Sequence, residues 1–217
     1  MRNLHGFFLN RSQNQQMSPV LRLRGFEIYE GWLDRAAQQE LVFAIRAIAQ
    51  AAPLIQPVTP SRKQMSVRMT SAGQYGWVTD IKGYRYTTAH PNGQPWPAIP
   101  KRIMDIWDAI AQVERRPECC LINYYDADAR MGLHQDCDEA NFKWPVVSVS
   151  LGDDALFRVG NETRGGSTKS IWLRSGDVVL MGGPARLTYH GVDRIKAGTS
   201  TLLSNGGRIN LTLRVVK

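Results

Sequence analysis

Short runs rich in β-branched residues follow one another from Pro117 to the end of the chain, and they restrict the possible folds more than any other feature. Gly, Asp and Asn separate the runs, as is typical of turns between strands. Many short strands joined by turns predict an all-β sandwich, jelly roll or barrel. A chain of 217 residues has a suitable length for one such domain. The predicted strands are Cys119–Tyr125, Pro145–Leu151, Ala155–Val159, Ser170–Leu173, Asp177–Met181 and Arg208–Val216.

Two helices are predicted before this β region. The first extends from about Asp34 to Ala51, and Asp34 can cap its start. The second begins near Pro100, a favourable residue for a first turn, and ends before Pro117. In each helix apolar residues recur at helical spacing and predict one buried face. These residues are Leu41, Val42, Ile45 and Ile48 in the first helix, and Ile103, Trp107, Ile110 and Val113 in the second.

Two other segments have neither helical nor strand spacing. Residues 1–18 end in a polar run, which predicts a disordered leader before a single domain over residues 19–217. The stretch from Ser71 to Pro97 is rich in Gly, Pro and aromatic residues. Such a composition predicts a long hairpin or loop that covers the core and not a layer of it.

Charge and cysteine content narrow the functional classes. Lys and Arg number 27 against 19 Asp and Glu, a net charge of +8, which favours a polyanionic partner such as nucleic acid. The alternative is that the charge only maintains solubility. Three cysteines with no paired spacing argue against a disulfide framework and fit a reducing cytoplasm. We find no signal peptide and no run of about 18 apolar residues that could span a membrane. We expect a monomer without a membrane partner.

The segment His134-Gln135-Asp136 is the first candidate for chemistry. In an extended segment, residues two apart point the same way, so one imidazole and one carboxylate would converge. A second imidazole, His190, follows later in the chain. Two His and one carboxylate form the facial triad of Fe(II) oxygenases, which leaves coordination positions open. Two alternatives stay open from spacing alone: a zinc site, and structural or surface histidines.

The C-terminal segment alternates strictly between apolar and polar residues. This pattern predicts a strand whose polar face carries Arg208, Asn210, Thr212 and Arg214. The polar face either meets water or points into the barrel, where two arginines would need anionic partners. A dicarboxylate would be such a partner, because a guanidinium can grip a carboxylate with two parallel hydrogen bonds.

Several motifs in order resemble those of the AlkB-type dioxygenases. The resemblance covers roughly residues 20–216, and several ordered motifs are far more specific than one. Cys137 departs from the pattern, because a basic residue stands at this position in some relatives. The motifs are Cys120–Tyr125, Leu133–Glu139, Val147–Gly152, Gly176–Gly191 and Arg208–Arg214, and upstream Met65–Thr70, Gly76–Trp77, Gly83–Tyr86 and Pro95–Pro100.

This resemblance implies a mainly β fold with some α+β elements. Its core would be a double-stranded β-helix, a form of jelly roll, over residues 117–217. N-terminal helices and a nucleotide-recognition lid over about residues 57–97 would precede it. His134, Asp136 and His190 would hold Fe(II) and form the catalytic centre.

The resemblance also implies two cosubstrates, 2-oxoglutarate and O₂. Arg208 would bind the distal carboxylate of 2-oxoglutarate, with Asn123, Tyr125 and Asn210 nearby. Arg214 would lie near the end that chelates iron. Decarboxylation to succinate would drive hydroxylation of a methyl group on a base nitrogen, and the methyl would leave as formaldehyde. Such bases include 1-methyladenine and 3-methylcytosine, in single- or double-stranded DNA or in RNA.

Substrate residues follow from the same resemblance. Trp77 would stack on the damaged base, and Tyr84 and Tyr86 would contact the backbone or line the pocket. Asp138 would face the base, where a carboxylate favours a positively charged alkylated base. Arg164 would touch substrate or phosphate. Alternatively, the aromatic residues only pack under a loop, and Asp138 and Arg164 are only exposed loop residues.

Two other functions are compatible with parts of this sequence. One is the same iron chemistry on a protein side chain or a small molecule. The other is a jelly-roll binding module without redox chemistry. A binding module predicts that His134, Asp136 and His190 do not converge and that Arg208 and Arg214 face solvent.

Overall fold

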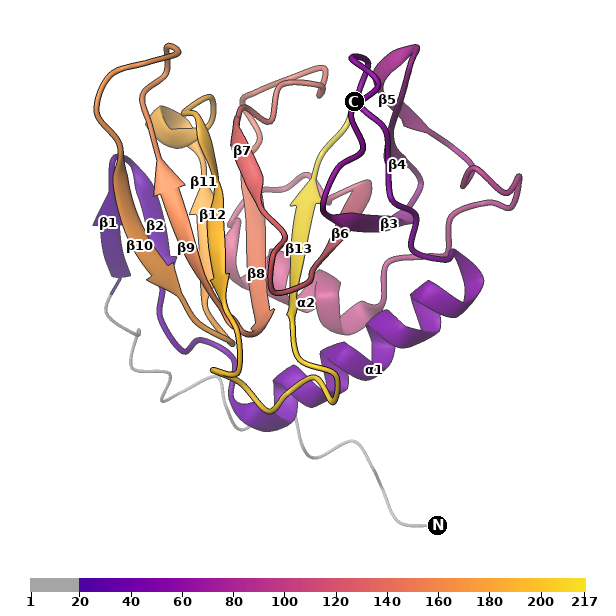
Figure 1. Ribbon diagram of the computed structural model, residues 1–217, viewed down its shortest axis with the longest axis horizontal. Coiled ribbons are helices and arrows are strands. Elements are labelled where there is room, and N and C mark those ends of the chain that lie inside the picture. The colour runs from indigo at the N-terminus through magenta and orange to yellow at the C-terminus, as the bar shows by residue number, and fades with distance from the viewer. Residues whose placement is uncertain (1–19) are drawn as a thin grey trace.

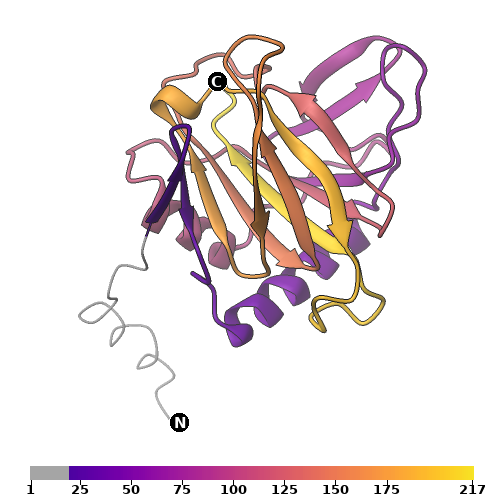
Figure 2. The same ribbon diagram turned by 60° about the vertical axis from the view of Figure 1, so that its left-hand side comes forward.

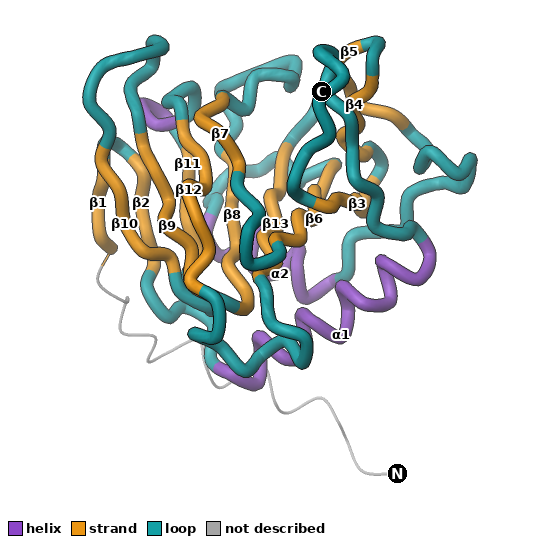
Figure 3. The backbone as a smooth tube through the Cα atoms, in the orientation of Figure 1, coloured by secondary structure: helices purple, strands orange, loops and turns teal. Residues whose placement is uncertain are grey.

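The computed structural model describes residues 20–217, so the leader predicted at residues 1–18 lies outside the described residues. Two antiparallel sheets face each other and form the predicted jelly-roll core (Figure 1). Loops gather at the two ends of this sandwich (Figure 3). The large sheet contains, in spatial order, β1 (Val20–Leu23), β2 (Phe26–Tyr29), β11 (Val178–Met181), β8 (Val146–Gly152), β13 (Arg208–Arg214), β6 (Cys119–Tyr125) and β3 (Arg68–Gly73).

The second, smaller sheet forms the other layer of the sandwich. A separate two-stranded hairpin, made of β4 (Gly76–Asp80) and β5 (Gly83–Thr87), lies near β3 and β6. A single 3₁₀ turn, η1 (Gly183–Ala185), follows β11. The small sheet contains, in spatial order, β10 (Lys169–Leu173), β9 (Asp154–Val159), β12 (His190–Lys196) and β7 (Met131–His134).

Two helices cover the outer face of the large sheet (Figure 2). The helix α1 (Arg35–Ala51) begins where predicted, because the Asp34 side chain accepts a hydrogen bond from the Ala37 backbone N–H at 2.9 Å. The helix α2 (Lys101–Ile110) buries Trp107 completely against the sheet. The apolar faces of the two helices are buried against the outer face of the large sheet and stabilise it. The inner face of the sheet can therefore carry polar side chains.

The C-terminal strand β13 has the alternation expected from the sequence. Ile209, Leu211 and Leu213 pack toward the helices in the main core. Arg208 and Arg214 lie on the opposite face, between the two sheets, and are only 1% and 5% exposed. The interpretation of a solvent-facing polar side is therefore wrong for this strand.

The second helix is shorter than predicted. It ends at Ile110, and Gln112 adopts a left-handed backbone with φ of +50°, which helices do not continue through. Val113 therefore lies beyond the helix, although it still packs partly buried against the same core. Val113 continues the helical spacing of the apolar residues, so the sequence pattern did not reveal that the helix ends before it.

The stretch from Ser71 to Pro97 is only partly a cover. Its first residues, Ser71 and Ala72, are fully buried in β3, which pairs with β6 at the edge of the large sheet. The later residues form the β4–β5 hairpin and connecting loops. The prediction of a covering hairpin is confirmed for β4 and β5, and it is wrong for Ser71–Gly73.

Among residues 20–217 we find no helix with the length and apolar character needed to cross a membrane.

Candidate active site

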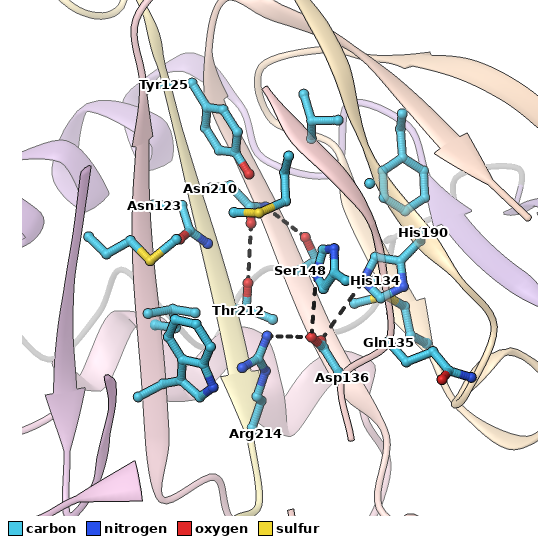
Figure 4. A pocket seen from close by; sticks show the side chains of 18 of the residues that line it. Asn123, Tyr125, His134, Gln135, Asp136, Ser148, His190, Asn210, Thr212 and Arg214 are labelled. Carbon is cyan, nitrogen blue, oxygen red and sulfur yellow. Dashed lines mark hydrogen bonds and ion pairs between the residues drawn. The ribbon is translucent and has the colours of Figure 1, made fainter. Parts of the chain in front are cut away.

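Three side chains with metal-ligand atoms converge between the two sheets (Figure 4). His134 ends β7 and His190 begins β12, and these two residues pair directly across the neighbouring strands. Asp136 follows His134 by two residues. One ligand atom from each of the three side chains lies within 4.8 Å of the others.

Backbone carbonyls fix the orientation of both imidazole rings. The His134 Nδ1 lies 2.9 Å from the carbonyl oxygen of Gly132, and the His190 Nδ1 lies 3.0 Å from that of Thr188. A carbonyl oxygen only accepts hydrogen bonds, so each Nδ1 carries the proton and each Nε2 keeps a free lone pair. Burial and the neighbouring His134 lower the pKa of His190 to about 4, so its imidazole is neutral near pH 7.

Within the described part of the chain, only one oxygen of the Asp136 carboxylate accepts a hydrogen bond. Its Oδ1 accepts a hydrogen bond from Arg214 Nη2 at 2.8 Å. Its Oδ2 is buried and has no hydrogen-bond partner among residues 20–217. Burial alone would raise the pKa of Asp136, but Arg214 and the two imidazoles hold it below the usual range of a carboxyl. An unpartnered carboxylate oxygen beside two free imidazole nitrogens fits the ligand set of Fe(II).

A pocket of about 780 Å³, part of it open to solvent, extends from these three side chains between the sheets. Arg208 lines it and donates to Ser150 Oγ at 2.6 Å and to the carbonyl oxygen of Asp153 at 3.1 Å. Its buried Nε has no partner, and Arg208 forms no ion pair with an acid in residues 20–217. Burial lowers the pKa of this guanidinium to about 10. A buried cation with no acid in direct ion-pair contact among these residues suits a carboxylate ligand.

The other residues predicted to hold the cosubstrate, Asn123, Tyr125 and Asn210, also line this pocket. Asn210 Nδ2 donates to Ser148 Oγ at 2.7 Å, and Asn210 Oδ1 accepts from Thr212 Oγ1 at 3.1 Å. These bonds fix the amide of Asn210 (Figure 4). Ser148 and Thr212 line the pocket too, although the sequence had not singled them out as site residues.

Trp77 and Asp138 form the mouth of the pocket. The Trp77 Nε1 donates to Asp138 Oδ2 at 2.7 Å, and both side chains line the pocket. Tyr84 stacks on Trp77 with ring centroids 5.5 Å apart and planes 17° from parallel. Tyr84 is 51% exposed and lines a neighbouring groove instead of the pocket itself.

Like Tyr84, the predicted substrate residues Tyr86 and Arg164 do not line the pocket. The Tyr86 hydroxyl instead makes a short hydrogen bond to Glu139 Oε1, and Arg214 Nη1 donates to the same hydroxyl at 3.4 Å. The Arg164 guanidinium lies over the Tyr189 ring, 5.2 Å from its centroid, in the loop after β9.

Comparison with known proteins agrees with this geometry. Residues 25–214 match the 2OG-Fe(II) oxygenase superfamily. The chain is 50% identical over 197 residues to the alpha-ketoglutarate-dependent dioxygenase AlkB homolog of Caulobacter vibrioides, with 90% of each chain covered. The chain belongs to the AlkB-type 2OG-Fe(II) oxygenases.

Two further similarities support this assignment. The Escherichia coli alpha-ketoglutarate-dependent dioxygenase AlkB is 40% identical over 183 residues, covering 82% of this chain and 84% of that protein. The solved structure described as "The structure of OsALKBH1" has a TM-score of 0.77 and 30% identity, and the match covers 91% of this chain and all of that one. As an AlkB-type enzyme, the protein uses Fe(II), 2-oxoglutarate and O₂.

The AlkB-type site also contains a buried ion pair that the sequence analysis missed. Arg186 Nη2 donates to Glu139 Oε2 at 2.9 Å, and Arg186 Nη1 donates to the Asp136 carbonyl oxygen at 2.5 Å. Glu139 thus connects Tyr86 in β5 to the segment that carries Asp136. The sequence contains one local indication of a role for Glu139, its position three residues after the predicted ligand Asp136.

A wider groove of about 2120 Å³, again partly solvent, adjoins the pocket of this AlkB-type enzyme, and His134 borders both. Two acids, Asp128 and Asp193, line the groove, and Asp193 pairs with Arg158 at 3.1 Å. Basic residues are more numerous along it than acids. They are Lys63, Arg130, Arg158 and Arg194.

The AlkB-type geometry contradicts the binding-module hypothesis. That hypothesis predicted separated histidines and solvent-facing arginines. Instead, the ring centroids of His134 and His190 are 4.7 Å apart, and Arg208 and Arg214 are buried.

Proposed function

We propose that this enzyme removes alkyl groups from the bases of nucleic acids by oxidation. The observation that carries the proposal is the buried, unpartnered Asp136 Oδ2, which lies 4.0 Å from His190 Nε2 in a pocket that His134 and Trp77 also line. Two relatives with shorter matches support a nucleic-acid substrate by their names. They are the DNA N(6)-methyladenine demethylase ALKBH1C of Arabidopsis thaliana, over 45% of this chain, and the tRNA demethylase abh1 of Schizosaccharomyces pombe, over 55%.

In this proposal, His134, Asp136 and His190 would hold Fe(II) through two Nε2 atoms and one carboxylate oxygen. Bound Fe(II), with 2-oxoglutarate and O₂, supplies the oxidant that hydroxylates the alkyl group. Arg214 keeps Asp136 ionised and oriented through the 2.8 Å hydrogen bond to Oδ1. This contact leaves Oδ2 without a protein partner, and Oδ2 would be the oxygen that holds the metal.

Arg208 would bind the distal carboxylate of 2-oxoglutarate in the interior of the pocket. Asn123, Tyr125 and Asn210 would line the rest of that cosubstrate site. Ser150 and the carbonyl of Asp153 hold the guanidinium still, so little side-chain entropy is lost when the carboxylate binds.

Trp77 and Asp138 would select the base. Trp77 offers an aromatic face for stacking, and its hydrogen bond to Asp138 fixes both side chains. A carboxylate at the mouth favours bases that alkylation has made positively charged, such as 1-methyladenine and 3-methylcytosine. Tyr84, Tyr86 and Arg164 would support the bound strand from outside the pocket.

The substrate strand would be DNA or RNA, single- or double-stranded, and it would follow the basic groove beside His134. We further propose that the enzyme acts as a monomer, because one chain supplies every residue of the site. A reducing cytoplasm is the proposed compartment, since Cys119, Cys120 and Cys137 are all free thiols.

An anaerobic mixture tests the proposed function in one experiment. It contains protein, Fe(II), 2-oxoglutarate and an oligonucleotide with one 1-methyladenine, and O₂ is then admitted. Mass spectrometry should detect formaldehyde, succinate and the unmodified base in equal amounts. Asp136→Ala should give none of these products. Succinate formation without any base repair would contradict the nucleic-acid substrate and favour oxidation of a protein or a small molecule.

A further inference from the structure

One arginine of the N-terminal hairpin connects both ends of the β9–β10 loop (residues 160–168). Arg24 Nη1 donates to the Gly160 carbonyl oxygen at 2.5 Å and to Asn161 Oδ1 at 2.7 Å. The same guanidinium donates to the carbonyl oxygen of Ser167 at 2.9 Å and to its Oγ at 3.2 Å. A single planar side chain therefore bridges the beginning and the end of the loop.

The conformation of Arg24 indicates that its side chain matters. Leu23 pairs with Phe26, so Arg24 and Gly25 form a two-residue hairpin turn, with φ values of +49° and +84°. Such turns favour Asn or Gly at the first position, because positive φ costs most other residues about 1 kcal/mol. The requirements of the turn therefore do not explain an arginine here, whereas its contacts with the loop do.

The loop is also attached to the active site. The side chain of Gln135, between two of the proposed metal ligands, donates to the Glu162 carbonyl oxygen at 3.0 Å. The Tyr189 backbone N–H donates to the Asn161 carbonyl oxygen at 2.9 Å, directly before His190. Movement of this loop would therefore change the edge of the pocket.

Arg164 is the cation that this loop carries. It is exposed, lies over the Tyr189 ring and forms no ion pair with any acid in residues 20–217. Its guanidinium is therefore available to a substrate strand beside the pocket. The hairpin and the loop that joins β9 to β10 lie on the same side of the molecule in Figure 1.

We propose that Arg24 is a positioning residue that holds the β9–β10 loop, and with it Arg164, in the place where Arg164 contacts the nucleic-acid substrate. This inference rests on the proposed function for the role of Arg164. The anchoring of the loop by Arg24 can be tested without any assumption about activity.

Hydrogen exchange of the full-length protein tests the anchoring. Arg24→Asn removes the guanidinium but creates an Asn-Gly turn, which suits the positive φ values and preserves the hairpin. Amides of residues 160–168 should exchange on the order of tenfold faster, while β1 and β2 stay protected. Arg22→Ala is the matched control, because Arg22 lies on the same hairpin and, within residues 20–217, forms an ion pair with Glu27 and not with the loop. Unchanged exchange in the loop of Arg24→Asn would overturn the proposal.

Steady-state kinetics test the link to substrate. Arg24→Asn should raise KM for a methylated oligonucleotide about fivefold, with KM for 2-oxoglutarate and kcat unchanged, since only strand binding is affected. When combined with Arg164→Ala, it should raise KM no further than Arg164→Ala alone. An unchanged KM, or fully additive effects, would overturn the proposal. If the wild type repairs no base at all, the proposed function fails instead, and the exchange experiment still decides on the anchoring.

Discussion

The two oxygens of the Asp136 carboxylate lie in different surroundings, and this difference leaves one of them available as a metal ligand. One oxygen is bound by Arg214 at 2.8 Å, and the other is buried without a partner in the described part of the chain. A buried polar atom without a partner costs free energy, so its retention indicates a ligand. Both imidazoles direct Nε2 to the same region, because their Nδ1 atoms are bound to backbone carbonyls.

The role of Arg208 leads to a residue-scale prediction. Arg208→Lys should raise KM for 2-oxoglutarate by about 10- to 100-fold, because a single ammonium cannot replace a guanidinium fork on a carboxylate. The oligonucleotide KM should stay within about twofold. Initial rates of succinate formation over a range of 2-oxoglutarate concentrations measure the effect. An unchanged demand for 2-oxoglutarate would refute this role of Arg208.

Asp138 allows charge to be separated from position. Asp138→Asn retains an oxygen that can accept from Trp77 Nε1, but it removes the negative charge. We expect kcat/KM for a cationic 1-methyladenine oligonucleotide to fall about fivefold, because only the attraction to the charged base is lost. An oligonucleotide with a neutral methylated base is the control and should be unaffected. Equal losses for both substrates would argue against charge selection.

At this scale, the sequence predicted residues that belong to a local pattern and missed residues defined by distant contacts. His134 and Asp136 share one short segment, and their convergence with His190 was anticipated. Glu139 was missed because its partners, Tyr86 and Arg186, lie 53 and 47 residues away. No local spacing reports such a contact.

At the scale of elements, the two helices support the inner face of the large sheet from behind. The helix α1 depends on one N-cap, since Asp34 accepts from the Ala37 N–H at 2.9 Å. Asp34→Ala should lower the free energy of unfolding by about 1 kcal/mol, whereas Asp34→Asn should lower it by only a few tenths. Urea denaturation measures both variants. Equal losses for Ala and Asn would show that capping is not the cause.

After Pro117, strand prediction succeeded for the runs rich in β-branched and apolar residues and failed for two strands with few of them. All six runs predicted after Pro117 coincide to within two residues with observed strands, namely β6, β8, β9, β10, β11 and β13. The strands β7 and β12 were missed, because Met131–His134 contains a glycine and His190–Lys196 contains three charged residues. These two strands hold the paired histidines, so the strands that carry two of the metal-ligand candidates were the ones that the sequence pattern did not reveal.

The whole molecule has a net charge of +8, and several basic residues line the groove beside the pocket. Binding of single-stranded DNA should therefore weaken steeply as salt rises. Arg130→Ala, in the groove, should reduce the slope of log affinity against log salt by about 0.7. Arg46→Ala, on α1, is the control and should leave the slope unchanged. Fluorescence anisotropy provides the measurement, and a salt-independent affinity would contradict a nucleic-acid groove.

Metal binding in the absence of O₂ tests most directly whether His134, Asp136 and His190 form one iron site. Equilibrium dialysis against Fe(II) should load about one ion per wild-type chain, as expected for a facial triad. Asp136→Ala and His190→Ala should bind none at the same concentration while circular dichroism shows a folded protein, and Asp138→Ala should load like the wild type. If Asp136→Ala binds Fe(II) as fully as the wild type, the iron site lies elsewhere and this account is wrong.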